Sequence, residues 1–147
     1  MADVTFHLRP AAPHEVIDLR HAVLRVGLPR DAAAFDGDEL PTTHHVVAVD
    51  AGGAIVGCAT MLASEWEREL AWQVRGMAVA PHLRGTGVGR ALLAALEARA
   101  RASGPRLMWC NARKPAAPFY ERLGWTIASE EFDIPTAGPH VKMTKRL

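Results

Sequence analysis

The sequence predicts a single α/β domain, and three observations support this fold class. The chain has 147 residues, a length that suits one hydrophobic core and is too short for two. Stretches with the two-residue period of strands are interleaved with stretches that have the period of helices. The clearest junction is Trp72–Arg99, where an apolar strand pattern meets a glycine-rich turn and then an amphipathic helix. We expect one domain spanning residues 1–147.

Composition and charge exclude several classes of function. The formal net charge is +1, and the absence of a Lys/Arg run argues against a nucleic-acid partner. No apolar run reaches the roughly 18 residues of a membrane span, so we expect no membrane partner. The N-terminus, with Asp3, His7 and Arg9, lacks the apolar stretch of a signal peptide, which favours a cytoplasmic location. Cys58 and Cys110 fall in apolar strand patterns and are expected to be buried, reduced thiols rather than acyl-accepting nucleophiles.

A strand and a helix are predicted in the first 27 residues. Apolar residues alternate with polar ones up to Pro10, where the strand should end: Val4, Phe6 and Leu8. A helix face then runs to Gly27: Val16, Leu19 and Val23. The basic residues on the other side of this helix are Arg20, His21 and Arg25, and one interpretation makes them a solvated flank.

Leu28–Thr43 mixes prolines and acids and predicts an exposed loop with a short helix at Arg30–Phe35. Its acidic residues are either solvated surface or a site that attracts a cationic amine: Asp36, Asp38 and Glu39. Two apolar strands follow, His44–Asp50 and Ala54–Leu62, joined by a tight hairpin turn. The polar stretch Ser64–Leu70 should be a connection before the fourth strand.

The turn after the fourth strand has the features of an anion-binding cradle. Pro81 ends the strand, and glycines then allow backbone N–H groups to approach an anion at a helix N-terminus. The cradle residues are Arg84, Gly85, Thr86, Gly87, Val88, Gly89 and Arg90. In the helix that follows, Val88, Leu92, Leu96 and Ala100 should face the core, with Arg90, Glu97 and Arg101 opposite.

This cradle lacks the Lys of a P-loop, and it has GxGxG rather than the GxGxxG of a dinucleotide-binding loop. Its spacing, Arg84-x-x-Gly87-x-Gly89, resembles the acyl-coenzyme A pyrophosphate loop of the GCN5-related N-acetyltransferases (GNAT family). A second signature of that family is similar to Leu107–Asn111, a strand ending in Asn, followed by Lys114–Trp125 with the sequence KPAAPFYERLGW. A glycine-rich turn without a ligand is the alternative.

The resemblance covers Val46–Trp125 and implies a mixed, mainly antiparallel sheet of about six or seven strands flanked by about four helices. Trp125–Phe132 and His140–Thr144 should supply the final strands, whose exposure makes a homodimer possible. The resemblance also implies acetyl-CoA as cosubstrate. The spacing of the seven histidines does not support a metal site, so we expect no metal. The residues that would contact the pantetheine are Met77, Ala78, Val79, Asn111 and Phe119, and Arg84 through Arg90 would hold the pyrophosphate. A splay between the fourth and fifth strands would admit the thioester.

By the same resemblance, Tyr120 would protonate the coenzyme A thiolate, a role that suits a phenol. The alternative is a core tyrosine bonded to the backbone. The family's fourth-strand Glu is missing, because Trp72–Gly76 contains no carboxylate. His140 is the first candidate base, and no dedicated base is the main alternative. Others are His44, His45, Glu65 and Glu67.

The resemblance predicts an N-acetyltransferase that uses an amine of a small molecule or protein as acceptor. The first helix and the loop after it would form one wall of the acceptor groove, so Arg20, His21 and Arg25 could instead contact an acidic group of the acceptor. A non-catalytic acyl-CoA-binding regulatory module of the same fold is the alternative function. A third hypothesis is an enzyme that binds ATP or NAD in the cradle.

Overall fold

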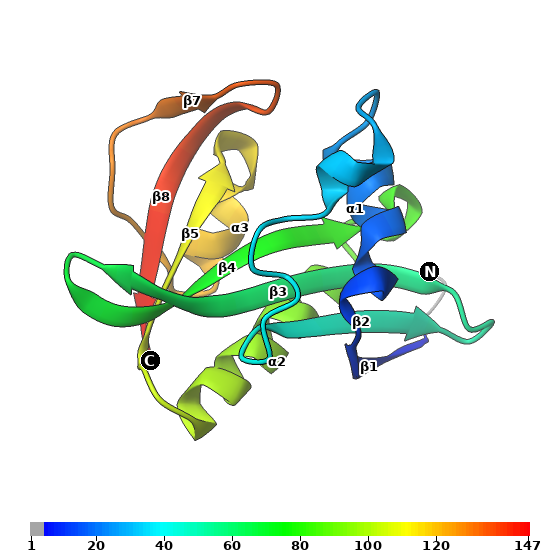
Figure 1. Cartoon of the computed structure of the whole chain (residues 1–147), viewed down its shortest axis with the longest axis horizontal. Helices are drawn as coiled ribbons and strands as arrows, with labels where there is room; N and C mark the ends of the chain where they lie inside the picture. The colour runs from blue at the N-terminus through cyan, green and yellow to red at the C-terminus, as the bar shows by residue number, and fades with distance from the viewer. Residues whose placement is uncertain (1–4) are drawn as a thin grey trace.

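The structure is a computed structural model that describes residues 5–147, and its centre is an eight-stranded sheet (Figure 1). The strands are β1 (Phe6–Ala11), β2 (His44–Asp50), β3 (Ile55–Trp66), β4 (Glu69–Val79), β5 (Leu107–Arg113), β6 (Thr126–Ile127), β7 (Phe132–Ile134) and β8 (Gly138–Arg146). Their order is β1-β2-β3-β4-β5-β8-β6, and β7 also pairs with β8. Only β4 and β5 are parallel, so the predicted mixed, mainly antiparallel sheet is confirmed.

Three α-helices cover the sheet in the described residues: α1 (Ile17–Leu24), α2 (Val88–Ala102) and α3 (Ala117–Arg122). Short 3-10 turns lie at Pro13–Val16, Arg30–Ala33, Pro81–Leu83 and Lys114–Ala116. Alternate residues of β2 pack into two separate clusters. Val47 and Val49 pack with Val16 and α1, whereas Val46 and Ala48 pack with α2. Because successive strand residues point to opposite faces, α1 covers one face of the sheet and α2 the other.

The helix predicted after the cradle is confirmed, since its four apolar positions are all buried: Val88, Leu92, Leu96 and Ala100. Gly57 of β3 allows the close packing, because a Cβ there would lie 2.6 Å from Val88 Cγ1. The prediction that Glu97 lies on the outer side of α2 is wrong. Glu97 is buried and accepts hydrogen bonds from Lys145 Nζ at 2.7 Å and Trp125 Nε1 at 3.4 Å.

Several predicted boundaries differ from the observed strands. Pro10 lies inside β1 instead of ending it, which an edge strand tolerates because one side needs no N–H donor. Ser64–Leu70 is not a polar connection: it contains the ends of β3 and β4 and a turn in which Glu67 and Arg68 have φ values of 47° and 70°. The expected strand at Trp125–Phe132 is present as the short β6 and the start of β7. Val4 lies outside the described residues.

Candidate functional site

The parallel strands β4 and β5 diverge after only three residue pairs. The pairs run from Trp72 with Met108 to Val74 with Cys110, and Figure 1 shows the two strands separating beyond them. On its other side β4 keeps its pairing with β3, with a register shift opposite Cys58 to Thr60. Gly76, with φ of 63°, lies in this irregular part of β4. The predicted splay between the fourth and fifth strands is therefore confirmed.

The divergence leaves one edge of β4 without a strand partner among the described residues. Ala80 N–H donates to the Val56 carbonyl on β3 at 2.8 Å. Backbone groups in a strand alternate between its two edges, so those of Val79, and of Met77 two residues earlier, point to the open edge. By the same alternation the backbone groups of Ala78 point toward its β3 partner Cys58, and its side chain is buried in the cluster that packs against α1.

A cavity of about 340 Å³ lies at this divergence. It collects side chains that are far apart in sequence, from α1, β4, β5, α3 and β8. Five of the predicted site residues line it: Met77, Asn111, Phe119, Tyr120 and His140. The structure thus brings the candidate base His140 together with residues that the resemblance assigns to the pantetheine and to the departing thiolate.

Tyr120 is held by two aromatic neighbours on the side of the cavity formed by α3. Its ring lies edge-on to Phe119 and Trp125, with centroid distances of 5.2 Å and 5.4 Å. The hydroxyl makes no hydrogen bond to any residue between 5 and 147, unlike a core tyrosine bonded to the backbone. Burial, with a contribution from Cys110, raises the pKa of Tyr120 well above its ordinary value. The phenol therefore keeps its proton at neutral pH, as an acid must.

His140 and Asn111 present polar atoms to the same cavity. His140 Nδ1 lies 2.7 Å from the Gly138 carbonyl, which can only accept, so Nδ1 carries the proton. In the neutral ring Nε2 then has a free lone pair. Lys142 Nζ donates to Asn111 Oδ1 at 2.9 Å, which fixes the amide and leaves its NH2 group available. None of the other base candidates lines the cavity: His44, His45, Glu65 and Glu67.

The cradle between β4 and α2 has the predicted backbone geometry. Gly85 and Gly87 have φ values of 78° and 96°, a left-handed conformation that favours glycine. The helix begins at Val88, so the first amides of α2 have no partner within the helix. A Cβ on Gly89 would lie 3.5 Å from Phe119 and 3.6 Å from Val79. The cradle is therefore contiguous with the open edge of β4 and, through Phe119, with the cavity.

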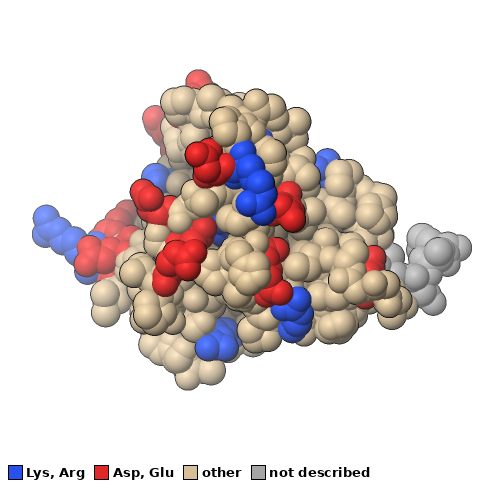
Figure 2. All heavy atoms as spheres, turned by 45° about the vertical axis from the view of Figure 1, so that its right-hand side comes forward, with Lys and Arg blue, Asp and Glu red and all other residues tan. Residues whose placement is uncertain are grey.

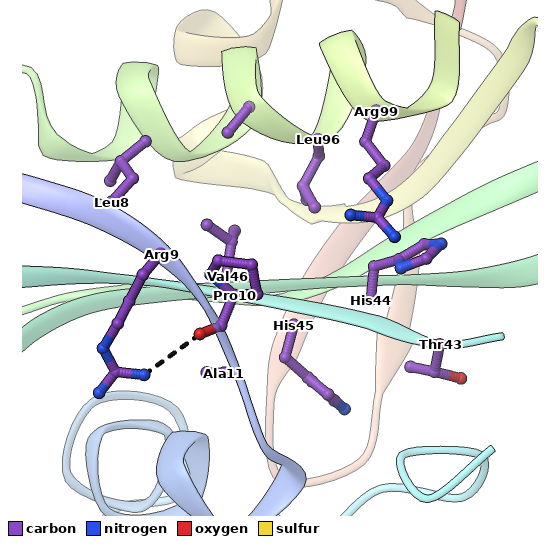
Figure 3. Close-up of a pocket in the computed structure, with 11 residues that line it drawn as sticks. Leu8, Arg9, Pro10, Ala11, Thr43, His44, His45, Val46, Leu96 and Arg99 are labelled. Carbon is purple, nitrogen blue, oxygen red and sulfur yellow. Dashed lines mark hydrogen bonds between the residues drawn. The ribbon is translucent and has the colours of Figure 1, made fainter. Parts of the chain in front are cut away.

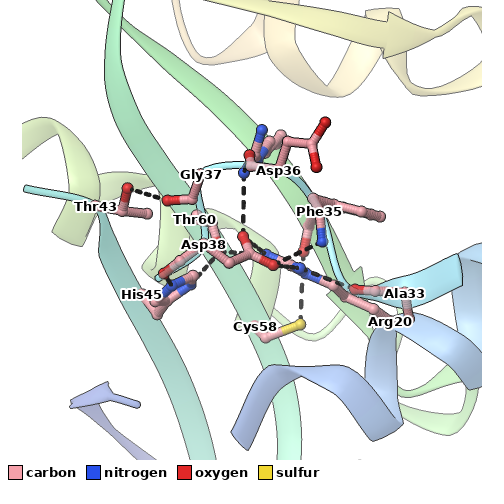
Figure 4. A network of polar contacts seen from close by, with 12 residues as sticks. Arg20, Ala33, Phe35, Asp36, Gly37, Asp38, Thr43, His45, Cys58 and Thr60 are labelled. Atoms are coloured by element: carbon pink, nitrogen blue, oxygen red, sulfur yellow. Dashed lines mark hydrogen bonds and ion pairs between the residues drawn. The ribbon is translucent and has the colours of Figure 1, made fainter. Parts of the chain in front are cut away.

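Arg20 belongs to neither of the predicted environments, because it is fully buried beneath the loop that follows α1 (Figure 4). Its guanidinium donates to both carboxylate oxygens of Asp38, at 2.7 Å and 3.2 Å, and to Thr60 Oγ1 at 2.8 Å. His45 completes the network with contacts to Thr60 Oγ1 at 2.7 Å and to the Asp38 carbonyl at 2.9 Å. Asp38 is thus a buried structural residue and not an exposed group for a cationic amine.

Asp38 stays ionised although it is buried. Burial alone would raise the pKa of its carboxyl, but hydrogen bonds from Arg20, the Phe35 amide and Arg75 outweigh it and lower the pKa below its usual range. Arg75 Nη2 lies 3.1 Å from Asp38 Oδ1 and also donates to the Asp36 carbonyl. The network therefore fixes the 28–43 loop against β3 and β4.

The two cysteines are buried, as predicted. Burial raises the pKa of the Cys58 thiol to about 11 and that of the Cys110 thiol to about 12. Both thiols are therefore protonated at neutral pH, which argues against either as an acyl-accepting nucleophile.

A second cavity of about 340 Å³ lies between β1, β2 and α2 (Figure 3). His44, His45 and Arg99 are among its lining residues. It contains none of the residues predicted to bind the coenzyme. The two histidines are therefore separated from Tyr120, which lines the first cavity.

Figure 2 shows both basic (Lys, Arg) and acidic (Asp, Glu) side chains on the same face of the molecule. None of the helices in residues 5–147 has the length and apolar character needed to span a membrane. Within the same residues, no three His, Cys, Asp or Glu side chains gather in a way that could hold a metal ion.

Some cavity residues were not predicted from the sequence. Phe35, Gln73, Arg75 and Arg113 line the cavity beside the predicted residues. Arg113 could have been found, because it lies two residues after Asn111 in a strand and so shares its face. Phe35 and Arg75 carry no such local signal, since a long-range network positions them.

Comparison with known proteins identifies relatives over most of the chain. The model of the acetyltransferase (GNAT) domain matches residues 41–127. The uncharacterized N-acetyltransferase YitI of Bacillus subtilis is 30% identical over 138 residues, which cover 90% of this chain and 91% of YitI.

Solved structures share the fold at lower identity. Escherichia coli ElaA has a TM-score of 0.77 at 20% identity, covering 97% of this chain and 100% of ElaA. An aminoglycoside 6'-N-acetyltransferase complexed with coenzyme A has a TM-score of 0.76 at 16% identity, covering 95% of this chain and 96% of that one.

Proposed function

The chain belongs to the GNAT acetyltransferase family, and we propose that it transfers the acetyl group of acetyl-CoA directly to an amine, with Tyr120 as general acid. The observation that carries the proposal is the Tyr120 hydroxyl, which lines the cavity without a hydrogen bond to the described residues. The cavity lies where β4 and β5 diverge and is contiguous with the glycine cradle. A solved structure of the same fold contains coenzyme A.

The residues present fit the coenzyme. The amides at the start of α2 and the exposed side chains of Arg84 and Arg90 would hold the pyrophosphate. The open edge at Met77 and Val79 would pair with the amides of the pantetheine arm, and Asn111 would donate to it. Acetyl-CoA would supply an activated acyl thioester. Gly89 suits this path because it adds no side chain between Val79 and Phe119.

Each catalytic task then has a candidate group in the chain. A backbone N–H in the irregular part of β4, near Gly76, would donate to the carbonyl oxygen as charge develops on it. Tyr120 would give its proton to the departing sulfur. His140 Nε2 would take a proton from the acceptor amine as the new C–N bond forms. Without a dedicated base, the amine would arrive unprotonated and, after the C–N bond forms, would release its proton to water or to the Tyr120 phenolate.

The test of this proposal is Tyr120→Phe, which removes the hydroxyl and keeps the ring between Phe119 and Trp125. We expect turnover, measured as free thiol release with an amine panel, to fall by about 10² to 10⁴. Calorimetry should show unchanged coenzyme A binding. The matched control is Glu121→Gln, an exposed neighbour on α3, which should retain full turnover. Equal turnover in Tyr120→Phe and the parent protein would remove Tyr120 from the mechanism.

One observation favours a second candidate function, a non-catalytic acyl-CoA-binding regulatory module of the same fold. Among residues 5–147, those that line the cavity include no carboxylate that could serve as a base. The module would bind acetyl-CoA in calorimetry and release no thiol with any amine. Thiol release that depends on an amine would exclude it.

A further inference from the structure

The acceptor end of the cavity is cationic. Three arginines line it, Arg25 from the end of α1, Arg75 from β4 and Arg113 from β5. No Asp or Glu is among the described lining residues. A polycationic acceptor would meet repulsion from this wall, because like charges in a partly desolvated site are unfavourable.

The arginines are only partly compensated by the protein. Asp38 is one carboxylate shared by two guanidinium groups, those of Arg20 and Arg75. Within residues 5–147, Arg25 and Arg113 form no ion pair, and each donates a hydrogen bond to the same Leu24 carbonyl at 3.0 Å. The wall formed by Arg25, Arg75 and Arg113 therefore carries an excess of positive charge, and some of its guanidinium N–H groups remain available to a ligand.

The ring of Phe35 packs against the guanidinium groups of three arginines. The guanidinium carbons of Arg20 and Arg25 lie 4.2 Å and 4.9 Å from the centroid of Phe35, and that of Arg75 lies 5.6 Å from it. Phe35 itself lines the cavity. Burial, together with the nearby Arg113 and Arg20, lowers the pKa of Arg25, so the protonated side chain is held at a cost that a bound anion would relieve.

We infer that the acceptor is a small amine that carries a carboxylate, with Arg25 and Arg113 binding the carboxylate and His140 and Tyr120 facing the amine. This inference rests on the proposed acetyl transfer. The planar guanidinium matches a carboxylate with two parallel hydrogen bonds. The cavity of about 340 Å³ also receives the acyl end of the coenzyme, so the remaining space suits an acceptor of amino-acid size.

The first experiment compares amino acids with the amines that lack their carboxylate, for example lysine with 1,5-diaminopentane. Thiol release should give a kcat/KM at least about tenfold higher for a carboxylate-bearing acceptor than for its decarboxylated counterpart, the value of a hydrogen bond to a charged group. O-Phosphoethanolamine tests a phosphate in the same role. Preference for the phosphate or for the carboxylate-free amines would overturn the inference.

The second experiment uses Arg25→Gln and Arg113→Gln, with the exposed Arg30→Gln as control. Each variant should raise KM for the preferred amino acid by about 10- to 100-fold. KM for the carboxylate-free amine should not rise, because removing an arginine takes away repulsion and no hydrogen bond to that acceptor. Equal losses for both acceptors would indicate a structural role and contradict the inference.

Calorimetric binding of the amino acid to the protein saturated with coenzyme A provides a readout independent of turnover. Amino-acid binding to the parent protein that is lost in both variants supports the carboxylate site. Failure of every amine to cause thiol release would refute the acetyl transfer but not this site. Amino-acid binding that is unaffected in both variants overturns the carboxylate site.

Discussion

The two sides of the cavity at the β4–β5 divergence present different chemical groups. On the side that we propose binds the coenzyme, the cradle at Arg84–Arg90 and the open edge of β4 offer mostly backbone N–H and C=O groups and glycines. On the side that we propose binds the acceptor, charged and aromatic side chains dominate, and a buried network around Arg20 and Asp38 holds them. Backbone groups present the same donors and acceptors whatever the side chains are, whereas the opposite side would bind its ligand through side chains that a substitution can change.

Among substitutions that affect one side of the cavity and not the other, we expect the largest loss of stability at Asp38. Asp38→Asn would leave Arg20 buried without its carboxylate, and breaking a buried pair typically costs about 3–5 kcal/mol. We expect this loss in the free energy of unfolding, measured by urea denaturation. The acceptor wall should be disordered, whereas coenzyme binding by the remaining folded protein should persist.

The control for Asp38 is its neighbour Asp36, whose exposed carboxylate makes no hydrogen bond to the described residues. Asp36→Asn should change stability by less than about 0.5 kcal/mol. The pH adds a second check. Because folding lowers the Asp38 pKa from its ordinary 3.8, the stabilisation is present above about pH 4 and is lost as the pH falls below it. The difference between the parent protein and Asp38→Asn should shrink in that range, and a constant difference would contradict the ion-pair interpretation.

We expect an intermediate loss of stability at Gly57, where β3 packs against α2, the helix that follows the cradle. In Gly57→Ala the new Cβ would lie 2.6 Å from Val88 Cγ1 and 2.9 Å from Leu92 Cδ1, so these side chains or the whole of α2 must shift. Overpacking of this kind costs about 1–3 kcal/mol, which urea denaturation would measure. Gly52→Ala is the control, because the nearest atom to its Cβ is an Asp50 oxygen at 3.5 Å. Similar stability changes in the two variants would show that α2 does not depend on the close approach.

The smallest effect on stability is expected at Gly89, where stability and binding should change in opposite directions. In Gly89→Ala the Cβ makes ordinary contacts with Phe119 and Val79, and alanine favours a helix by up to about 1 kcal/mol. The added methyl group should weaken coenzyme A binding by about 10- to 100-fold if it costs one charged hydrogen bond. Ala98→Gly, on the exposed side of α2, should lower stability and leave binding unchanged. Unaltered coenzyme affinity in Gly89→Ala would place the ligand elsewhere.

The same contrast explains what the sequence could predict. The cradle and α2 follow from local spacing, whereas Tyr120 and Asn111 follow from the family resemblance and His140 from its side-chain chemistry. The structure places these three residues in one cavity. The burial of Arg20 could not be predicted, because its partners Asp38 and Thr60 are 18 and 40 residues away. A charged residue on a helix otherwise predicts solvent exposure. Only tertiary contacts identify one that pairs inside the core.

The brief parallel contact between β4 and β5 also divides the molecule along the chain. Every antiparallel partner of β1 to β4 lies before residue 80, and every antiparallel partner of β5 to β8 lies after residue 106. A cut in the loop that follows α2 would therefore yield two fragments whose antiparallel ladders are each self-contained. Their reassembly would depend on the three residue pairs between β4 and β5 and on a shared apolar core. A molecule bound between the two strands would contact both fragments and stabilise their association.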